Sequence, residues 1–306
     1  MSKFLKGCLI TACVSIVLGI IILVGVAISG RGNEVIDAVE NGGIVWDEDG
    51  FSVGSTVVVD TAILENEASM EQALENGNQY TYPVDKIEKL QMELEAGKFE
   101  ILTGDGDEIR IRTSKKVKVS NDGDSIEIET PDRMIIFGFG KNDVQSVEIT
   151  LPKDYKFHTM EIEIAAGELD ADSLTAENIG LDIGAGRMTV NQLEGKNTDI
   201  NVGAGEVIIE SGNIGTMDLD VGMGSFLMKG NITDDLDADC GMGSMDVTLS
   251  GQFVDHDYEV DCGMGSVRVG DMTYSGMSSG QHVDNDTDSE FDLDCGMGSI
   301  NIFFAE

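Results

Sequence analysis

The hexapeptide Asp-Cys-Gly-Met-Gly-Ser occurs three times in the sequence, at 239–244, 261–266 and 294–299. Thiol and thioether sulfurs are ligands that select Cu(I), and an activated thiol can carry redox chemistry. No Cys-x-x-Cys pair accompanies the motif, and the chain has only three histidines, His158, His256 and His282. The surrounding pattern therefore has to decide whether the motif is a chemical site or one structural position used three times.

The motif belongs to a longer repeat that is centred on glycine. Five segments between 160 and 247 place this glycine 19 residues apart, two more follow after longer insertions, and an earlier copy stands at 91–101. Such a period predicts a repeat architecture in which each copy contacts its neighbours. We expect bends at the eight glycines, namely Gly97, Gly167, Gly186, Gly205, Gly224, Gly243, Gly265 and Gly298.

Each repeat alternates apolar and polar residues on both sides of its glycines. Leu181 and Ile183 flank the polar Asp182, and after the glycines Met188 and Val190 are the apolar residues. A period of two predicts a strand with one buried face, and the shift of phase requires a bend, which glycine permits. Because one short unit cannot bury its own face, the sequence predicts an all-β, solenoid-like stack of rungs over 84–306. A β-sandwich of short hairpins is the alternative.

The sulfur residues take fixed places in this repeat. The cysteines of the motif fall in the apolar column of Ile183 and Val202, so we expect them to be buried as small hydrophobic residues. A metal ion could not reach cysteines in an inward-facing column from solvent. The column of Ala185 and Ala204 is filled in later rungs by methionines, which we expect inside the bend, where they would fill irregular space: Met223, Met242, Met264 and Met297.

The residue before the cysteine column is acidic or an amide in every rung, and alternation predicts that it faces solvent. Stacked carboxylates repel one another, and a hard cation such as Ca²⁺ would relieve that repulsion, as would water, salt and partial protonation. The loop 281–290 resembles the start of a Ca²⁺ loop but lacks its glycine and its last glutamate, so it is better interpreted as a solvated insertion. The candidate Ca²⁺ ligands are Asp182, Asp220, Asp239, Asp261 and Asp294.

The composition excludes some partners. The chain has 57 acidic and 19 basic residues and a formal net charge of −38. Such a chain repels nucleic acids and anionic surfaces, which leaves cationic peptides, proteins, envelope polymers or divalent ions as partners. No nucleophile and base are placed together by their spacing, so we expect no catalytic residues and no cofactor. A polysaccharide-active β-helix enzyme is the less favoured alternative.

The N-terminus predicts a membrane anchor. Residues 7–29 form 23 positions without a charge, long enough to cross a bilayer as a helix. Lys3 and Lys6 precede this segment, so residues 1–6 should be cytoplasmic and the rest of the chain extracytoplasmic. We expect an acidic juxtamembrane spacer over 30–83. Cleavage after the segment Ala27 to Ser29, and lipidation at Cys13, are the alternatives.

The stretch 149–193 resembles a bacterial family with β-strand repeats. A strand ends in Leu151-Pro152 and is followed by rungs of the form apolar-x-apolar-Gly-x-Gly-x-apolar. The family is the putative-adhesin family of unknown function, and the similarity covers roughly 84–306. Together with the N-terminal anchor, the resemblance is to membrane-anchored members from Gram-positive bacteria. It implies an envelope protein with a solenoid-like domain and no catalytic residues that could be carried over.

These patterns together predict a non-catalytic interaction or adhesion module at the cell envelope. Sensing of envelope stress is a variant of that role, and a cation-binding structural surface protein is the alternative. The C-terminal segment 301–306 lacks a polar cap. We therefore expect it to present an exposed strand edge through which two copies could associate.

Overall fold

The computed structural model describes residues 44–47, 50–53, 67–131, 145–276 and 278–305. The chain divides into two compact units, Met1–Glu65 and Asn66–Glu306. The first unit contains an antiparallel pair of strands, β1 (Ile44–Asp47) and β2 (Gly50–Val53). The predicted membrane helix over 7–29 lies outside the described residues. Among the helices that are described, none is long and apolar enough to span a membrane.

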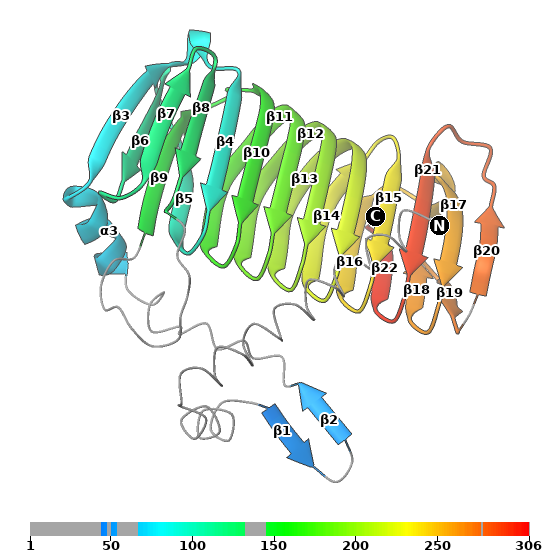
Figure 1. The fold of residues 1–306 in the computed structure, drawn as a ribbon. Helices are drawn as coiled ribbons and strands as arrows, with labels where there is room; N and C mark the ends of the chain where they lie inside the picture. Colours follow the sequence, from blue (N-terminus) through cyan, green and yellow to red (C-terminus); the bar gives the residue numbers. More distant parts are fainter. Residues whose placement is uncertain (1–43, 48–49, 54–66, 132–144, 277, 306) are drawn as a thin grey trace. The chain divides into compact units, whose positions relative to one another are not determined.

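The second unit is a 20-stranded sheet that is wound into two facing walls (Figure 1). Three long strands run through both walls, because the first residues of each lie in one wall and its last residues lie in the other. They are β11 (Glu168–Ile183), β12 (Arg187–Val202) and β13 (Glu206–Val221). They pair in parallel with a shift of 19 residues, so that Leu181 lies beside Ile200 and Ile200 beside Leu219. The 19-residue period of the sequence is thus the rung repeat of the structure.

The other rungs use a separate strand for each wall. On the first wall the described strands follow the order β8 (Ser125–Glu129), β4 (Lys89–Leu94), β10 (Phe157–Ile164), β11, β12, β13, β15 (Leu236–Cys240), β21 (Glu290–Cys295) and β17 (Asp257–Cys262). On the second wall the order is β9 (Gln145–Pro152), β5 (Gly97–Gly104), β11, β12, β13, β14 (Ser225–Ile232), β16 (Ser244–Ser250), β22 (Ser299–Ala305) and β18 (Ser266–Val269). All of these neighbours pair in parallel, as in a solenoid-like stack and unlike a sandwich of hairpins.

The order of rungs in space differs from their order in the sequence at both ends. The last rung of the chain, β21 with β22, is inserted between the rung of β15 and β16 and the rung of β17 and β18. The expected exposed edge at 301–306 is therefore restricted to the residues after Ile302. Strand β22 pairs with β16 over Ser299–Ala305 but with β18 only over Ser299–Ile302, so association of two copies through residues 303–305 stays a prediction.

Antiparallel strands close both ends of the stack. Strands β3 (Asn78–Pro83), β6 (Glu108–Thr113) and β7 (Lys118–Asp122) cover the first end, and β19 (Met272–Ser275) and β20 (Ser278–Val283) cover the other. Helix α3 (Glu67–Glu75) packs beside β9 and β6, and two short 3₁₀ turns stand at Val84–Lys86 and Phe253–Asp255. Residues 67–83, expected in the spacer, therefore contribute a helix and a strand to the stack, which begins before residue 84.

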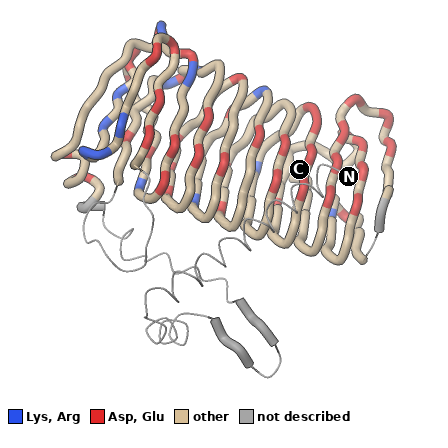
Figure 2. The backbone as a smooth tube through the Cα atoms, in the orientation of Figure 1, with Lys and Arg blue, Asp and Glu red and all other residues tan. Residues whose placement is uncertain are grey.

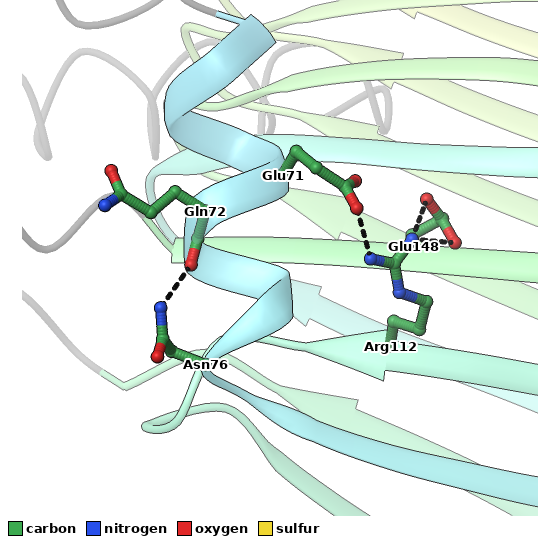
Figure 3. Close-up of polar contacts among 5 residues, drawn as sticks. All are labelled: Glu71, Gln72, Asn76, Arg112 and Glu148. Atoms are coloured by element: carbon green, nitrogen blue, oxygen red, sulfur yellow. Dashed lines mark hydrogen bonds and ion pairs between the residues drawn. The ribbon is translucent and has the colours of Figure 1, made fainter.

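An arginine joins helix α3 to the sheet (Figure 3). Arg112 donates hydrogen bonds to both carboxylate oxygens of Glu148, at 3.0 and 3.1 Å, and to Glu71 of the helix at 2.7 Å. The side chains of Met70 and Leu74 are buried on the same helix. Charge and apolar contact together fix α3 over the end of the stack.

The glycine column exists because neighbouring rungs approach closely. None of its eight members has a positive φ angle, so the expectation that glycine provides an otherwise strained backbone is wrong. A Cβ on Gly243 would instead lie 2.4 Å from the carbonyl oxygen of Gly224 and 2.7 Å from Cγ1 of Val221. At five other glycines of the column, an added Cβ would lie 2.3–2.4 Å from the carbonyl oxygen of the column glycine in the adjacent rung. These are Gly186, Gly205, Gly224, Gly265 and Gly298. The column marks places where neighbouring rungs approach too closely for a side chain.

Candidate functional site

Two columns of acidic residues run along the outer face of the first wall, which we call the acidic wall. The first column is the predicted one and stacks in register in the order Glu163, Asp182, Asn201, Asp220, Asp239, Asp294 and Asp261. The second column, two residues earlier in each rung, was not predicted: Glu161, Gly180, Asp199, Asp218, Asp237, Asp292 and Glu259. The repeated Asp-x-Asp pattern could have revealed it. Figure 2 shows the two columns as acidic stretches recurring from strand to strand.

Basic residues do not compensate these carboxylates on their own wall. From β10 to β17, the strand segments of the acidic wall contain one basic residue, Lys196, which lies at the edge of the wall in β12, outside the two columns. The described ion pairs of the later rungs, Arg187 with Glu206 and Lys229 with Glu210, lie on the second wall. The acidic wall therefore carries an uncompensated negative potential over most of the stack.

Crowding changes the acidity of the central carboxylates. Partial burial, followed by the charges of Asp220, Asp294, Asp237 and Asp292, raises the pKa of Asp239 to about 7. Burial and the neighbouring Asp294 likewise raise the pKa of Asp292 to about 6. Oxygen Oδ1 of Asp239 is buried and has no hydrogen-bond partner among the described residues. The wall thus holds weakly acidic groups where a cation would be stabilised.

A shallow groove of about 490 Å³ lies on the acidic wall across β4 and β10 to β13. Gly180 helps to open it, because this glycine interrupts the second column and a Cβ there would have no neighbour closer than Glu161 Cγ at 3.8 Å. Two amide hydrogen bonds of 2.8 Å line the groove, from Asn197 to Asn178 and from Asn201 to Asp199. Its carboxylates and amides suit ligands rich in hydrogen-bond donors.

The Ca²⁺ candidates stand in one straight column and do not converge. Within the described ranges, no group of three or more His, Cys, Asp or Glu side chains is arranged to hold a metal ion. The acidic insertion uses its polar groups for its own turns. Asp257 accepts hydrogen bonds from the backbone of Asn285 and Thr287, and Asp284 accepts one from the backbone of Asp286. The loop is built as a structural insertion.

The three motif cysteines are buried and free, as the apolar column predicted. They stack in the order Cys240, Cys295, Cys262, because the last rung is inserted between the other two. A hydrogen bond to Cys295, and then burial, raise the pKa of Cys240, while burial raises the pKa of Cys262. The same hydrogen bond with Cys240 lowers the pKa of Cys295, so only Cys240 and Cys262 are held as protonated, poorly nucleophilic thiols.

The methionine column lies on the outside of the bends, so the expectation that these side chains fill space inside them is wrong. Their exposed fractions are 56% for Met223, 55% for Met242, 55% for Met297 and 75% for Met264. Neighbouring bends are hydrogen-bonded to one another, which places the four residues in consecutive rungs. The glycines on either side interrupt the in-and-out alternation, and alternation was the only guide to side-chain direction in the sequence.

Solved structures of similar proteins cover about three quarters of the chain. A putative cell adhesion protein from Clostridium sporogenes is 16% identical, with a TM-score of 0.33 over 74% of this chain and 99% of that one. A putative adhesin from Bacteroides fragilis is 12% identical, with a TM-score of 0.41 over 74% and 96%. A putative lipid binding protein from Parabacteroides distasonis is 15% identical, with a TM-score of 0.36 over 74% and 97%.

No curated protein matches this sequence. The model of one family, Toastrack DUF4097, matches residues 87–279, which is more than half of the chain and spans the rungs from β4 to the end strand β20. The resemblance to a putative-adhesin family of unknown function is thereby confirmed. On the strength of that match, this chain belongs to the Toastrack DUF4097 family.

Proposed function

We propose that this protein is a non-catalytic interaction module whose acidic wall binds a polycationic partner at the cell envelope. The observation that carries the proposal is the acidic wall itself, with two in-register carboxylate columns and a single basic residue, Lys196, at the edge of its strand segments from β10 to β17. Adhesion to a cationic polymer, peptide or protein is the activity that such a surface supports. The names of the similar adhesion proteins agree with this role.

The regular spacing of the wall favours an extended partner. Carboxylates of one column repeat about every 4.8 Å along the stack. A single exposed ion pair contributes only about 0–1 kcal/mol, so one contact would not hold a partner. Several contacts that form together on a rigid surface reinforce one another, because each one raises the effective concentration of the next. A flexible cationic chain lying along the wall would use this effect.

Binding of poly-L-lysine to the full chain in detergent would test the proposal. Removing three exposed carboxylates of the second column (Asp199→Asn, Asp218→Asn and Asp237→Asn) should weaken binding at least tenfold at low salt. A control with the same loss of charge in exposed turns is Asp105→Ser, Asp154→Asn and Asp271→Asn, which should change the affinity less than twofold. Equal losses in the two variants would show that net charge alone attracts the partner, and would refute a role for the wall.

The membrane anchor belongs to the same proposal. Residues 7–29 would hold the stack outside the membrane, with residues 1–6 in the cytoplasm, as the flanking lysines favour. Recognition of cationic, envelope-damaging peptides would extend the role to envelope-stress sensing. Protease added to intact cells should digest an epitope tag at the C-terminus. Protection of that tag in intact cells would overturn the proposed topology.

A cation-binding structural role is the second candidate, and the raised pKa of Asp239 favours it, because a bound cation would relieve the same repulsion. Millimolar Ca²⁺ should then raise the melting temperature of the protein. Asp239→Asn should abolish that increase, whereas Asp271→Asn should leave it intact. A melting temperature and oligomeric state that do not respond to Ca²⁺ would eliminate this candidate.

A further inference from the structure

Four methionines form a continuous row along the outer edge of the later rungs. The bend hydrogen bonds that join them are uniform. Each methionine N–H donates to a carbonyl of the neighbouring rung, with lengths of 2.7, 2.7, 2.7 and 2.8 Å for Met223, Met242, Met297 and Met264. Successive methionine backbones are therefore separated by one rung repeat, about 4.8 Å. The row is continuous only because the rung of Met297 is inserted between those of Met242 and Met264.

The fold does not require methionine at these positions. Ala185 and Ala204 occupy the same place in two earlier rungs, are also exposed, and make the same bend hydrogen bonds, at 2.8 and 2.7 Å. Methionine at this place leaves a large apolar side chain more than half exposed, which packing does not explain. The difference between methionine and alanine at this place is therefore an exposed thioether side chain, not a difference in the bend.

Thioether sulfur is a soft ligand, and soft ligands select monovalent copper over hard cations. A metal–sulfur bond of about 2.3 Å places two sulfurs on one ion up to about 4.6 Å apart. The rung repeat nearly equals that separation, and three rotatable bonds let each methionine adjust. Glycines on both sides of each methionine leave the side chains room to approach an ion.

The surroundings of the row favour a cation. Each methionine follows an acidic residue of the first column by three positions: Asp220, Asp239, Asp294 and Asp261. Asp220 is exposed and the other three carboxylates are partly buried on the acidic wall, next to the bends. A negative potential of this kind raises the local concentration of a positively charged ion. The nearby thiols of the same motif are buried, so the exposed sulfurs are the accessible ones.

We propose that Met223, Met242, Met297 and Met264 form a binding row for a soft monovalent metal ion, Cu(I) or its analogue Ag(I). Neighbouring thioethers on adjacent rungs would bridge one ion, so the row offers three such gaps. Binding needs no deprotonation, because a thioether carries no acidic proton. The site is separate from the proposed cationic partner surface, and either could exist without the other.

Cu(I) binding to the full chain in detergent, with ascorbate present and a chromophoric Cu(I) chelator as competitor, tests this proposal. Every protein in the series carries Cys8→Ala and Cys13→Ala, so that the N-terminal thiols do not contribute. The test variant replaces all four row methionines by alanine, which Ala185 and Ala204 show the bend to accept. One control replaces the four buried methionines Met188, Met217, Met228 and Met245 by leucine, and a second replaces Cys240, Cys262 and Cys295 by valine.

We expect the parent protein and both controls to take up Cu(I) at pH 7 and pH 5, and the row variant to lose at least tenfold in affinity. With Ag(I) and methyl-labelled methionine, the NMR signals that the row variant lacks should be the ones that shift. Absence of Cu(I) uptake by the parent would overturn the proposal. So would unchanged uptake by the row variant, or loss of uptake in the cysteine control, which would place the ion on the thiols.

Discussion

Replacing Gly243 by alanine is the sharpest test of how the rungs stack. The new Cβ would lie 2.4 Å from the carbonyl oxygen of Gly224, where ordinary contacts begin at 3.4 Å, so the bends must separate by about 1 Å. Two hydrogen bonds already at 3.1 Å, from Gly243 to Gly222 and from Ser244 to Gly224, would be broken by that movement. Each bond contributes about 1 kcal/mol, and overpacking costs a further 1–3 kcal/mol or so. We expect a loss of about 4 kcal/mol in the free energy of unfolding.

Thermal unfolding followed by circular dichroism measures this loss. In a unit of this size, about 4 kcal/mol corresponds to a fall of roughly 10 °C in melting temperature. The matched control is Gly180→Ala in strand β11, where the nearest atom would be Glu161 Cγ at an ordinary 3.8 Å. That substitution should raise stability by about 0.5–1 kcal/mol, because alanine loses less backbone entropy on folding than glycine does.

The reasoning depends on the difference between these two glycines. A Gly243→Ala protein that melts within 2–3 °C of the parent, and no lower than Gly180→Ala, would show that close approach of the rungs does not select glycine. The stack would then have enough freedom to accept a methyl group, and the regular spacing of glycines in this sequence would need another explanation.

Three further predictions concern pH and the cysteine column. Since the folded-state pKa of Asp239 is raised to about 7, its contribution to stability is complete below pH 4 and is lost as the pH rises through 7. Asp239→Asn should therefore melt higher than the parent at pH 8 and show a smaller pH dependence between 5 and 8, whereas an unchanged pH dependence would contradict the raised pKa. The ring of His256 stacks on Phe291 with a centroid distance of 4.1 Å, and burial lowers its pKa. The stability that the neutral ring contributes is therefore present above pH 6.5 and is lost as the pH falls through the folded-state pKa. His256→Phe should therefore lose less unfolding free energy than the parent between pH 7 and pH 5, as measured by urea unfolding. An equal loss in both proteins would contradict the lowered pKa. Cys262→Val should change the unfolding free energy by less than about 1 kcal/mol, because Val202 and Val221 fill the same column in earlier rungs; a larger loss in urea unfolding would reveal a role beyond packing.

Local pattern was sufficient to predict the strands and their buried faces. Alternation around Leu181 and Ile183, and the 19-residue spacing of the glycines, predicted the parallel, in-register pairing that the structure has. The burial of the cysteines followed from the same alternation, as did the acidic column. These features are local because side chains on a strand alternate between two faces whatever the strand's neighbours are.

The order of the rungs could not be predicted. Three rungs contain the same Asp-Cys-Gly-Met-Gly-Ser segment, so each presents nearly the same surface to its neighbours, and the pattern gives no preference for one order over another. Longer insertions before the last two rungs let the chain form the rung of β17 and β18 first and then return to place β21 and β22 between that rung and the rung of β15 and β16. Only the tertiary structure shows that Cys295 lies between Cys240 and Cys262, and that β22 lies between β16 and β18 over Ser299–Ile302.

The sequence by itself thus determined the repeat, the strand faces and the negative charge, because these depend on the period of the side chains and on composition. The tertiary structure decided which rungs are neighbours, that the methionines face outward, and that glycine is selected by close approach of the rungs. Those properties depend on distances between segments far apart in the chain. A periodic pattern fixes the direction of a side chain along a strand, but not at a glycine bend, and not which copy of a repeat lies beside another.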